Sequence, residues 1–100
     1  MLKFAVFVSG GGTDLQSIID AKNEGKINGK IALVLSNRQK AYGLQRAKDA
    51  GIETTVVKKD DALIVKMLKE RNIDFIVLAG YLAILTDELI DAYPNKIMNI

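Results

Sequence analysis

Hydrophobic residues in this chain fall into two kinds of pattern that alternate from one end to the other. Short continuous apolar runs, rich in valine, isoleucine and leucine, end at glycine or polar residues. Runs of this kind are typical of parallel strands that are covered on both faces. The pattern predicts strands over residues 2–9, 30–35, 54–57 and 75–79, and the start of a fifth strand at residue 97.

Between these runs, apolar residues recur at intervals of three or four, which predicts amphipathic helices. Thr13 and Gln16 have the spacing of a capping box, with Thr13 as the N-cap of the first helix. Asp60 or Asp61 is expected to cap the third helix, and Thr86 the fourth. The four helices are expected over residues 13–22, 42–50, 61–72 and 86–93.

The regular alternation of strands and helices predicts a single α/β domain. Its expected fold class is an open parallel, Rossmann-like sheet with right-handed crossovers and helices on both faces. Ligands in such sheets bind beyond the carboxyl ends of the strands, at the point where the strand order reverses. Three loops are expected at that edge, over residues 9–13, 36–40 and 80–85.

Composition narrows the range of functions. The 100 residues are 49% hydrophobic and 26% charged, as in an ordinary globular domain, and the net charge of +2 is too small and too evenly spread for nucleic-acid binding. The absence of cysteine and histidine excludes disulfides, thiolate or histidine metal sites and Ser-His-Asp catalysis, so no metal is expected. The first strand is too short for a signal peptide or a membrane span, which predicts a cytoplasmic location and no membrane partner.

The loop after the first strand, Gly10-Gly11-Gly12-Thr13, carries the strongest chemical signal. Glycines let the backbone approach a ligand closely, and the start of a helix offers unpaired N–H groups and a positive dipole end. Thr13 adds a hydroxyl donor. The other interpretation is a tight turn that uses glycine only for its conformational freedom. Three consecutive glycines exceed what a turn needs, which favours a small phosphate monoester as the ligand.

A dinucleotide-binding loop is an alternative interpretation of the same segment. Such a loop requires G-x-G-x-x-G and an acidic residue about 20 positions later. Here Leu15 occupies the place of the third glycine, and Asn37 rather than an acid follows the second strand. Arg38 could pair with the 2′-phosphate of NADP, so an NADP-binding Rossmann module stays open.

The other candidate segments are less specific. Residues 36–38 (Ser-Asn-Arg) either form a simple turn or shape the ligand cleft. Residues 80–85 are unusual for a loop because they are apolar, and they pack beneath the last helix, line a pocket for a flat ligand, or do both. Asn99, the polar residue of the last strand, either polarises a carbonyl group or is an edge residue without a chemical role.

Together these segments resemble the phosphoribosylglycinamide formyltransferases, the glycinamide ribonucleotide transformylases of de novo purine biosynthesis. These enzymes transfer a formyl group from 10-formyltetrahydrofolate to the amine of 5-phosphoribosylglycinamide. The resemblance covers the whole chain in one register. It rests on residues 8–16 (VSGGGTDLQ), 36–38 (SNR), 77–85 (VLAGYLAIL) and 98–100 (MNI).

The resemblance implies a role for several residues. The loop that starts the first helix would hold the phosphate of the ribonucleotide, and the apolar loop would line the folate pocket with backbone groups against the pterin. The asparagine near the end of the chain would bind the formyl oxygen as the tetrahedral intermediate forms. The implied residues are Gly12, Thr13 and Asp14 for the phosphate, Leu82, Ala83, Ile84 and Leu85 for the folate, and Asn99 for catalysis.

The sequence departs from the pattern of this family in three places. Family members carry a catalytic histidine two positions after the asparagine, whereas this sequence stops at Ile100. Residues 1–100 are therefore expected to be an N-terminal phosphate-binding half-domain, truncated at the start of the fifth strand and inactive without a C-terminal half. Asp14 stands where many relatives have asparagine, and Ala83 where a basic residue is common.

Two further expectations concern partners. If the chain acts on its own, the lack of histidine favours a non-catalytic domain that only binds a sugar phosphate, which is the remaining alternative. A sheet that stops in its fifth strand leaves an apolar edge uncovered, and such an edge predicts self-association.

Overall fold

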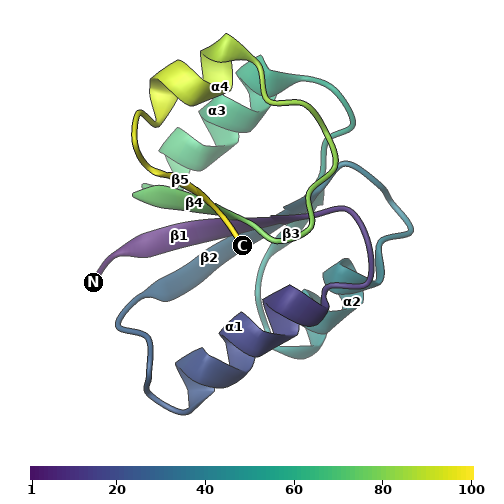
Figure 1. The fold of residues 1–100 in the computed structure, drawn as a ribbon, viewed down its shortest axis with the longest axis vertical. Helices are drawn as coiled ribbons and strands as arrows, with labels where there is room; N and C mark the ends of the chain where they lie inside the picture. The colour runs from purple at the N-terminus through teal and green to yellow at the C-terminus, as the bar shows by residue number, and fades with distance from the viewer.

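The structure is a computed structural model that describes residues 1–100, and it contains one parallel sheet between two layers of helices (Figure 1). The strand order is β3-β2-β1-β4-β5, and every neighbouring pair is parallel. The predicted fold class is confirmed. The strands are β1 (Lys3–Val8), β2 (Lys30–Ser36), β3 (Thr54–Val56), β4 (Phe75–Leu78) and β5 (Ile97–Asn99).

The strand order reverses at β1. From β1 the chain moves outward through β2 and β3 on one side, then returns to add β4 and β5 on the other side. The connections that leave β1 and β4 therefore run to opposite faces of the sheet. Neighbouring connections that diverge in this way open a crevice at the carboxyl ends of the strands, which is the usual ligand position in such folds.

Two helices cover each face of the sheet (Figure 1). Because successive side chains of a strand point to opposite faces, β1 contributes Val6 and Val8 to the core under α1 and α2, and Phe7 to the core under α3 and α4. None of the helices combines the length and the apolar character needed to cross a membrane. The helices are α1 (Thr13–Asn23), α2 (Tyr42–Asp49), α3 (Asp61–Glu70) and α4 (Asp87–Ala92).

The start of α1 differs from the prediction. Gly12, not Thr13, is the N-cap, and its carbonyl accepts the first helical hydrogen bond from the Gln16 N–H at 2.8 Å. The Gln16 side chain donates to Asp20 at 2.9 Å instead of closing a capping box. The predicted capping box is therefore wrong. The helix begins one residue earlier than predicted because Gly12 has a left-handed backbone, with φ of 75°, which turns the chain into the helix there.

The N-cap residues of α3 and α4 lie where they were predicted, but the two differ in how their side chains bond. The Asp60 carboxylate caps α3 by accepting a hydrogen bond from the Leu63 N–H at 3.0 Å. Thr86 is the N-cap residue of α4, yet its hydroxyl makes no cap. Both its hydroxyl and its N–H donate to Asp61 Oδ2, at 2.5 and 2.9 Å, so that Asp61 joins the first turns of α3 and α4.

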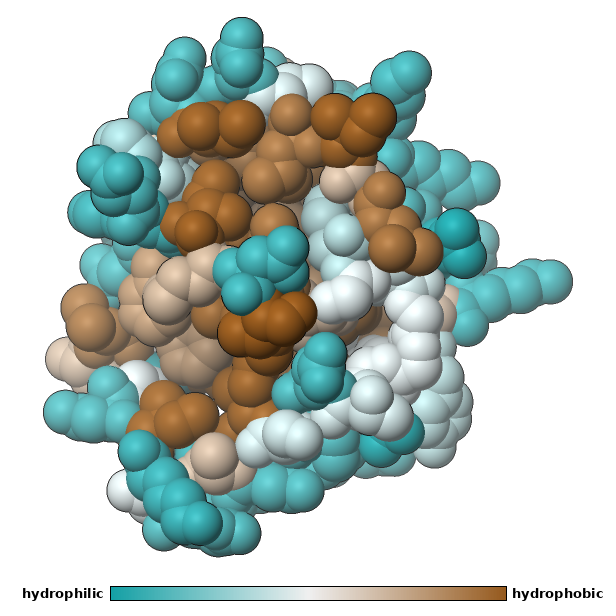
Figure 2. All heavy atoms as spheres, in the orientation of Figure 1, coloured by the Kyte–Doolittle hydropathy of each residue, from teal (hydrophilic) through white to brown (hydrophobic).

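The edge strand β5 and the residue that follows it leave apolar side chains in solvent. Met98 is 48% exposed and Ile100 is 60% exposed. Figure 2 shows large apolar areas on the side of the molecule from which Figure 1 is viewed, where β5 and the C-terminus lie. The predicted self-association through this edge stays a prediction.

Candidate functional site at the carboxyl edge of the sheet

The three loops expected at one edge of the sheet meet there through a single hydroxyl group. Ser9, which follows β1 and is 2% exposed, donates to Asn37 Oδ1 at 2.5 Å and accepts from the Leu82 N–H at 2.8 Å. Asn37 follows β2, and Leu82 lies in the connection after β4. Asn37 therefore does more than form a turn, since its side chain joins the loop after β2 to the loop after β1. Sequence reasoning did not single out Ser9, although a serine that directly ends a buried strand was the available signal.

The connection after β1 forms what we call the glycine loop, Gly10–Gly12. Gly12 is glycine for two reasons: its φ is positive, and a Cβ there would lie 2.6 Å from the Gly43 Cα of α2. Gly10 and Gly11 have neither constraint, because their φ values are not positive and a Cβ on either would meet no atom within 4 Å. The turn thus explains only one of the three glycines. The other two keep the outer side of the loop free of side chains.

The outer side of the glycine loop faces a shallow cavity. This cavity has a volume of about 360 Å³, and its lining includes Gly10, Gly11 and the two cationic residues Arg38 and Lys40. Two positive charges beside the glycine loop suit a small anion.

Thr13 and Asp14 form the exposed first turn of α1. The N–H groups of these residues and of Gly12 donate to no acceptor in the protein. A helix start with unpaired donors and an aligned backbone dipole attracts anions. The Asp14 carboxylate is favourable for the dipole when the site is empty and repels a bound dianion.

The apolar loop after β4 divides its side chains between the core and solvent. Leu85 and Tyr81 pack against the core under α3 and α4, whereas Leu82 is 70% exposed and Ile84 is 91% exposed. The interpretation that this loop packs beneath the last helix is therefore confirmed for Tyr81 and Leu85, and the pocket for a flat ligand stays a prediction. Four residues that were predicted to act together, 82–85, do not share one surface.

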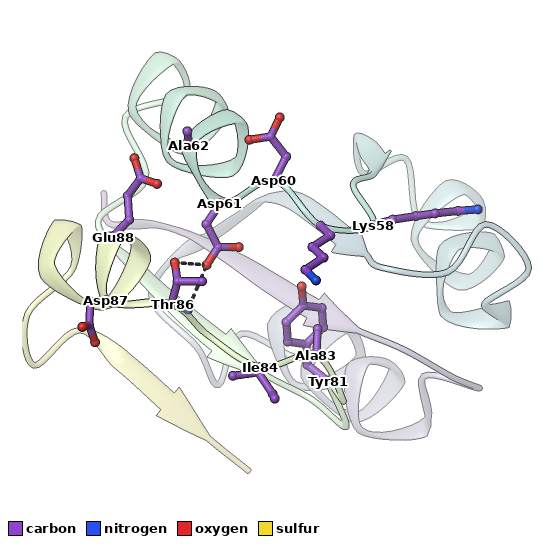
Figure 3. A pocket seen from close by; sticks show the side chains of 11 residues that line it. Lys58, Asp60, Asp61, Ala62, Tyr81, Ala83, Ile84, Thr86, Asp87 and Glu88 are labelled. Atoms are coloured by element: carbon purple, nitrogen blue, oxygen red, sulfur yellow. Dashed lines mark hydrogen bonds between the residues drawn. The ribbon is translucent and has the colours of Figure 1, made fainter.

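Part of this loop lines a cavity of about 730 Å³ (Figure 3). Of the four predicted folate residues, Ala83 and Ile84 border this cavity and Leu82 and Leu85 do not. Lys58, Lys59 and the first turns of α3 and α4 form the opposite wall.

Acidic side chains outnumber basic ones in the lining of this cavity, four to two. Asp60, Asp61, Asp87 and Glu88 all border it. Burial, followed by the negative charge of Asp61, raises the pKa of the Tyr81 hydroxyl above its ordinary value of 10.0, so this tyrosine stays neutral. No group of three or more acidic side chains is arranged to hold a metal ion.

Asn99 is the last residue of β5 and lies opposite Leu78 of β4, which in turn pairs with Phe7 of β1. The register therefore places Asn99 at the carboxyl edge of the sheet, on the β4 side of the crevice. Its side chain is exposed. The structure thus brings Asn99 to the same edge as the glycine loop and the β4–α4 loop.

An open parallel sheet, a switch point at β1 and a helix start with unpaired N–H donors define an α/β domain of the Rossmann-like class, with a candidate anion site at its carboxyl edge. Residues 2–100 match the sequence model of the formyl transferase family (Formyl transferase, N-terminal part), so the chain belongs to that family.

The chain is similar to several phosphoribosylglycinamide formyltransferases. It is 47% identical to the enzyme of Haemophilus influenzae, with an alignment that covers 100% of this chain and 51% of that protein. It is 35% identical to the enzyme of Escherichia coli, covering 99% of this chain and 50% of the relative. The crystal structure of glycinamide ribonucleotide transformylase 1 from Symbiobacterium toebii superposes with a TM-score of 0.94 at 36% identity, over 99% of this chain and 50% of that one.

This chain therefore spans about half the length of the bacterial relatives that it matches. The family match favours a formyltransferase over both an NADP-binding module and a sugar-phosphate-binding domain without catalysis.

Proposed function

We propose that this chain forms the ribonucleotide-binding part, and one side of the folate site, of a phosphoribosylglycinamide formyltransferase. The reaction would transfer the formyl group of 10-formyltetrahydrofolate to the amine of 5-phosphoribosylglycinamide in purine biosynthesis. The observation that carries this proposal is the meeting of three loops at the switch point of the sheet, in a chain that matches the family over residues 2–100.

In this proposal the phosphate of the ribonucleotide binds at the start of α1. Gly12, Thr13 and Asp14 would hold it through backbone N–H groups that have no acceptor in the protein, with the Thr13 hydroxyl as a further donor. Arg38 and Lys40 border the same loop and would offset the charge of Asp14.

The folate would lie along the β4–α4 loop, with Leu82, Ala83, Ile84 and Leu85 as the predicted contacts. The exposure of Leu82 and Ile84 supports this, because apolar side chains of that size gain most when a flat ligand covers them.

Asn99 would donate its amide N–H to the formyl oxygen. When the substrate amine attacks the formyl carbon, negative charge develops on that oxygen, and a fixed donor stabilises the resulting tetrahedral intermediate. The C–N bond to the folate then breaks, and the formyl group stays on the ribonucleotide. We propose that residues corresponding to the second half of the relatives supply the group that moves the amine proton, together with the rest of the folate site.

Calorimetric titration with 5-phosphoribosylglycinamide tests the phosphate site. The structure makes Gly11 the position to change, because a side chain there has open space, whereas one at Gly12 meets Gly43. Gly11→Glu adds a carboxylate beside the phosphate and should abolish saturable binding. Asn28→Glu adds the same charge to an exposed residue before β2, at the opposite edge of the sheet, and should leave binding intact. Equal binding by both variants would contradict the proposed site.

Formyl transfer is the second test. This chain with both substrates should show no turnover, and turnover should appear when the second half of a relative is added. Turnover by this chain by itself would overturn the division of roles between the halves.

A further inference from the structure

Helix α2 contacts the glycine loop although it lies in a different part of the chain. The Gly43 N–H donates to the Gly10 carbonyl at 3.0 Å. Arg46, one turn later, donates from Nε to the Gly11 carbonyl at 2.7 Å and from Nη1 to Gln16 Oε1 at 3.3 Å. Two successive carbonyls of the loop are thus held by α2.

These bonds fix the direction of the loop N–H groups. In a planar trans peptide the N–H points away from the preceding carbonyl, and the chain has no cis peptide. Because the Gly10 and Gly11 carbonyls point toward α2, the N–H groups of Gly11 and Gly12 point away from it. Successive N–H groups that point the same way, next to a left-handed residue, form an anion-binding concavity.

Arg46 is itself held in place. Its guanidinium lies over the ring of Tyr42, 5.1 Å from the ring centre, and its Cδ lies 3.2 Å from where a Cβ of residue 12 would be. An arginine that is packed on two sides and bonded to a backbone carbonyl is pre-organised, whereas lysine would offer a single mobile charge.

We propose that Arg46 is a positioning residue for phosphate binding: it holds the glycine loop by the Gly11 carbonyl and by Gln16, so that the loop N–H groups face the ligand. The inference rests on the proposed function, which places the phosphate at this loop. It adds a residue of α2 to a site that the sequence assigned entirely to the start of α1.

The test compares Arg46→Gln, Arg46→Lys and Arg71→Gln in the ¹⁵N-labelled full chain. Amide NMR signals of Gly11 and Gly12 report the loop without ligand, and titration with 5-phosphoribosylglycinamide gives the Kd. Arg71→Gln is the matched control, because it removes the same charge from an exposed ion pair with Glu53.

Arg46→Gln should shift the Gly11 and Gly12 signals and weaken binding about tenfold, the loss expected for one charge-assisted hydrogen bond. Arg46→Lys should shift the same signals and recover only part of the affinity, while Arg71→Gln should change neither.

Three results would overturn the inference: unmoved loop signals in Arg46→Gln, full affinity in Arg46→Gln, or complete rescue by Arg46→Lys, which would assign the effect to charge. If the proposed function is wrong, the unmodified chain itself will not bind the ribonucleotide. The Gly11 and Gly12 signals of Arg46→Gln, measured without ligand, then decide whether Arg46 positions the loop.

Discussion

The two sides of the crevice are built differently. On the β1 side, the glycine loop is held by hydrogen bonds from Gly43 and Arg46 and by close backbone packing at Gly12. On the β4 side, the loop is joined to the crevice by one bond to Ser9 and leaves Leu82 and Ile84 in solvent. We infer from this difference that residues 1–100 hold the proposed phosphate site more rigidly than the proposed folate site, of which they supply one wall.

We expect the largest loss of stability from a substitution that disturbs the backbone packing of the glycine loop. Gly12→Ala should destabilise the fold by about 2–4 kcal/mol, because it combines a left-handed backbone with a contact of 2.6 Å to the Gly43 backbone. Urea unfolding measures this.

Gly25→Ala is its matched control. Its φ is 77°, close to that of Gly12, but a Cβ there meets nothing, so the cost should be about 1 kcal/mol. Equal losses for the two variants would mean that the contact with α2 contributes nothing.

Ser9→Ala should have the next largest effect, because it removes the one bond between the two sides. Asn37 Oδ1 and the Leu82 N–H would each lose a partner, at a cost of about 1–3 kcal/mol. Hydrogen exchange at the Leu82 amide should become faster. Ser17→Ala, which removes an exposed hydroxyl, should change neither quantity. An unchanged Leu82 amide in Ser9→Ala would show that the two sides are not coupled.

Sequence patterns predicted the strands to within one residue, because buried parallel strands leave continuous apolar runs that end at glycine or polar residues. They also predicted which loops share the carboxyl edge. They missed Ser9, Arg46 and the link between Asp61 and Thr86, since these depend on contacts between residues at least 25 positions apart. The capping box failed for a related reason: spacing shows which residue can cap, but the left-handed glycine decides where the helix begins.

A substitution on the β4 side should have a smaller effect, which appears in the affinity for folate rather than in the free energy of unfolding. Ile84→Ser should leave the free energy of unfolding unchanged within about 0.5 kcal/mol, because Ile84 is 91% exposed. If the side chain covers a folate, the same change should weaken folate binding severalfold in a fluorescence titration. Ile90→Ser, at a partly exposed position of α4, is the control. Equal folate affinities for both variants would contradict the predicted folate wall.

The smallest expected effect concerns the ion pair between Glu53 and Arg71, which lies outside both sides of the crevice. The hydrogen bonds from Arg71 lower the pKa of Glu53 below its ordinary value of 4.5. A lowered folded-state pKa stabilises the protein above the unfolded pKa, and this contribution is lost as the pH falls through the folded one.

Because the pair is exposed, Glu53→Gln should cost less than about 1 kcal/mol at neutral pH and nothing in strong acid. Thermal unfolding as a function of pH measures the difference. A loss of stability that persists at low pH would show that the side chain acts by packing rather than by its charge.

The most direct test of the account is an amide NMR titration of the unmodified chain with 5-phosphoribosylglycinamide. We expect saturable shifts at Gly11, Gly12, Thr13 and Asp14, and smaller shifts at Leu82, whose N–H is bonded to Ser9. Shifts confined to the β4–α4 loop, or no shifts in a folded chain, would contradict the claim that these residues form the proposed phosphate site.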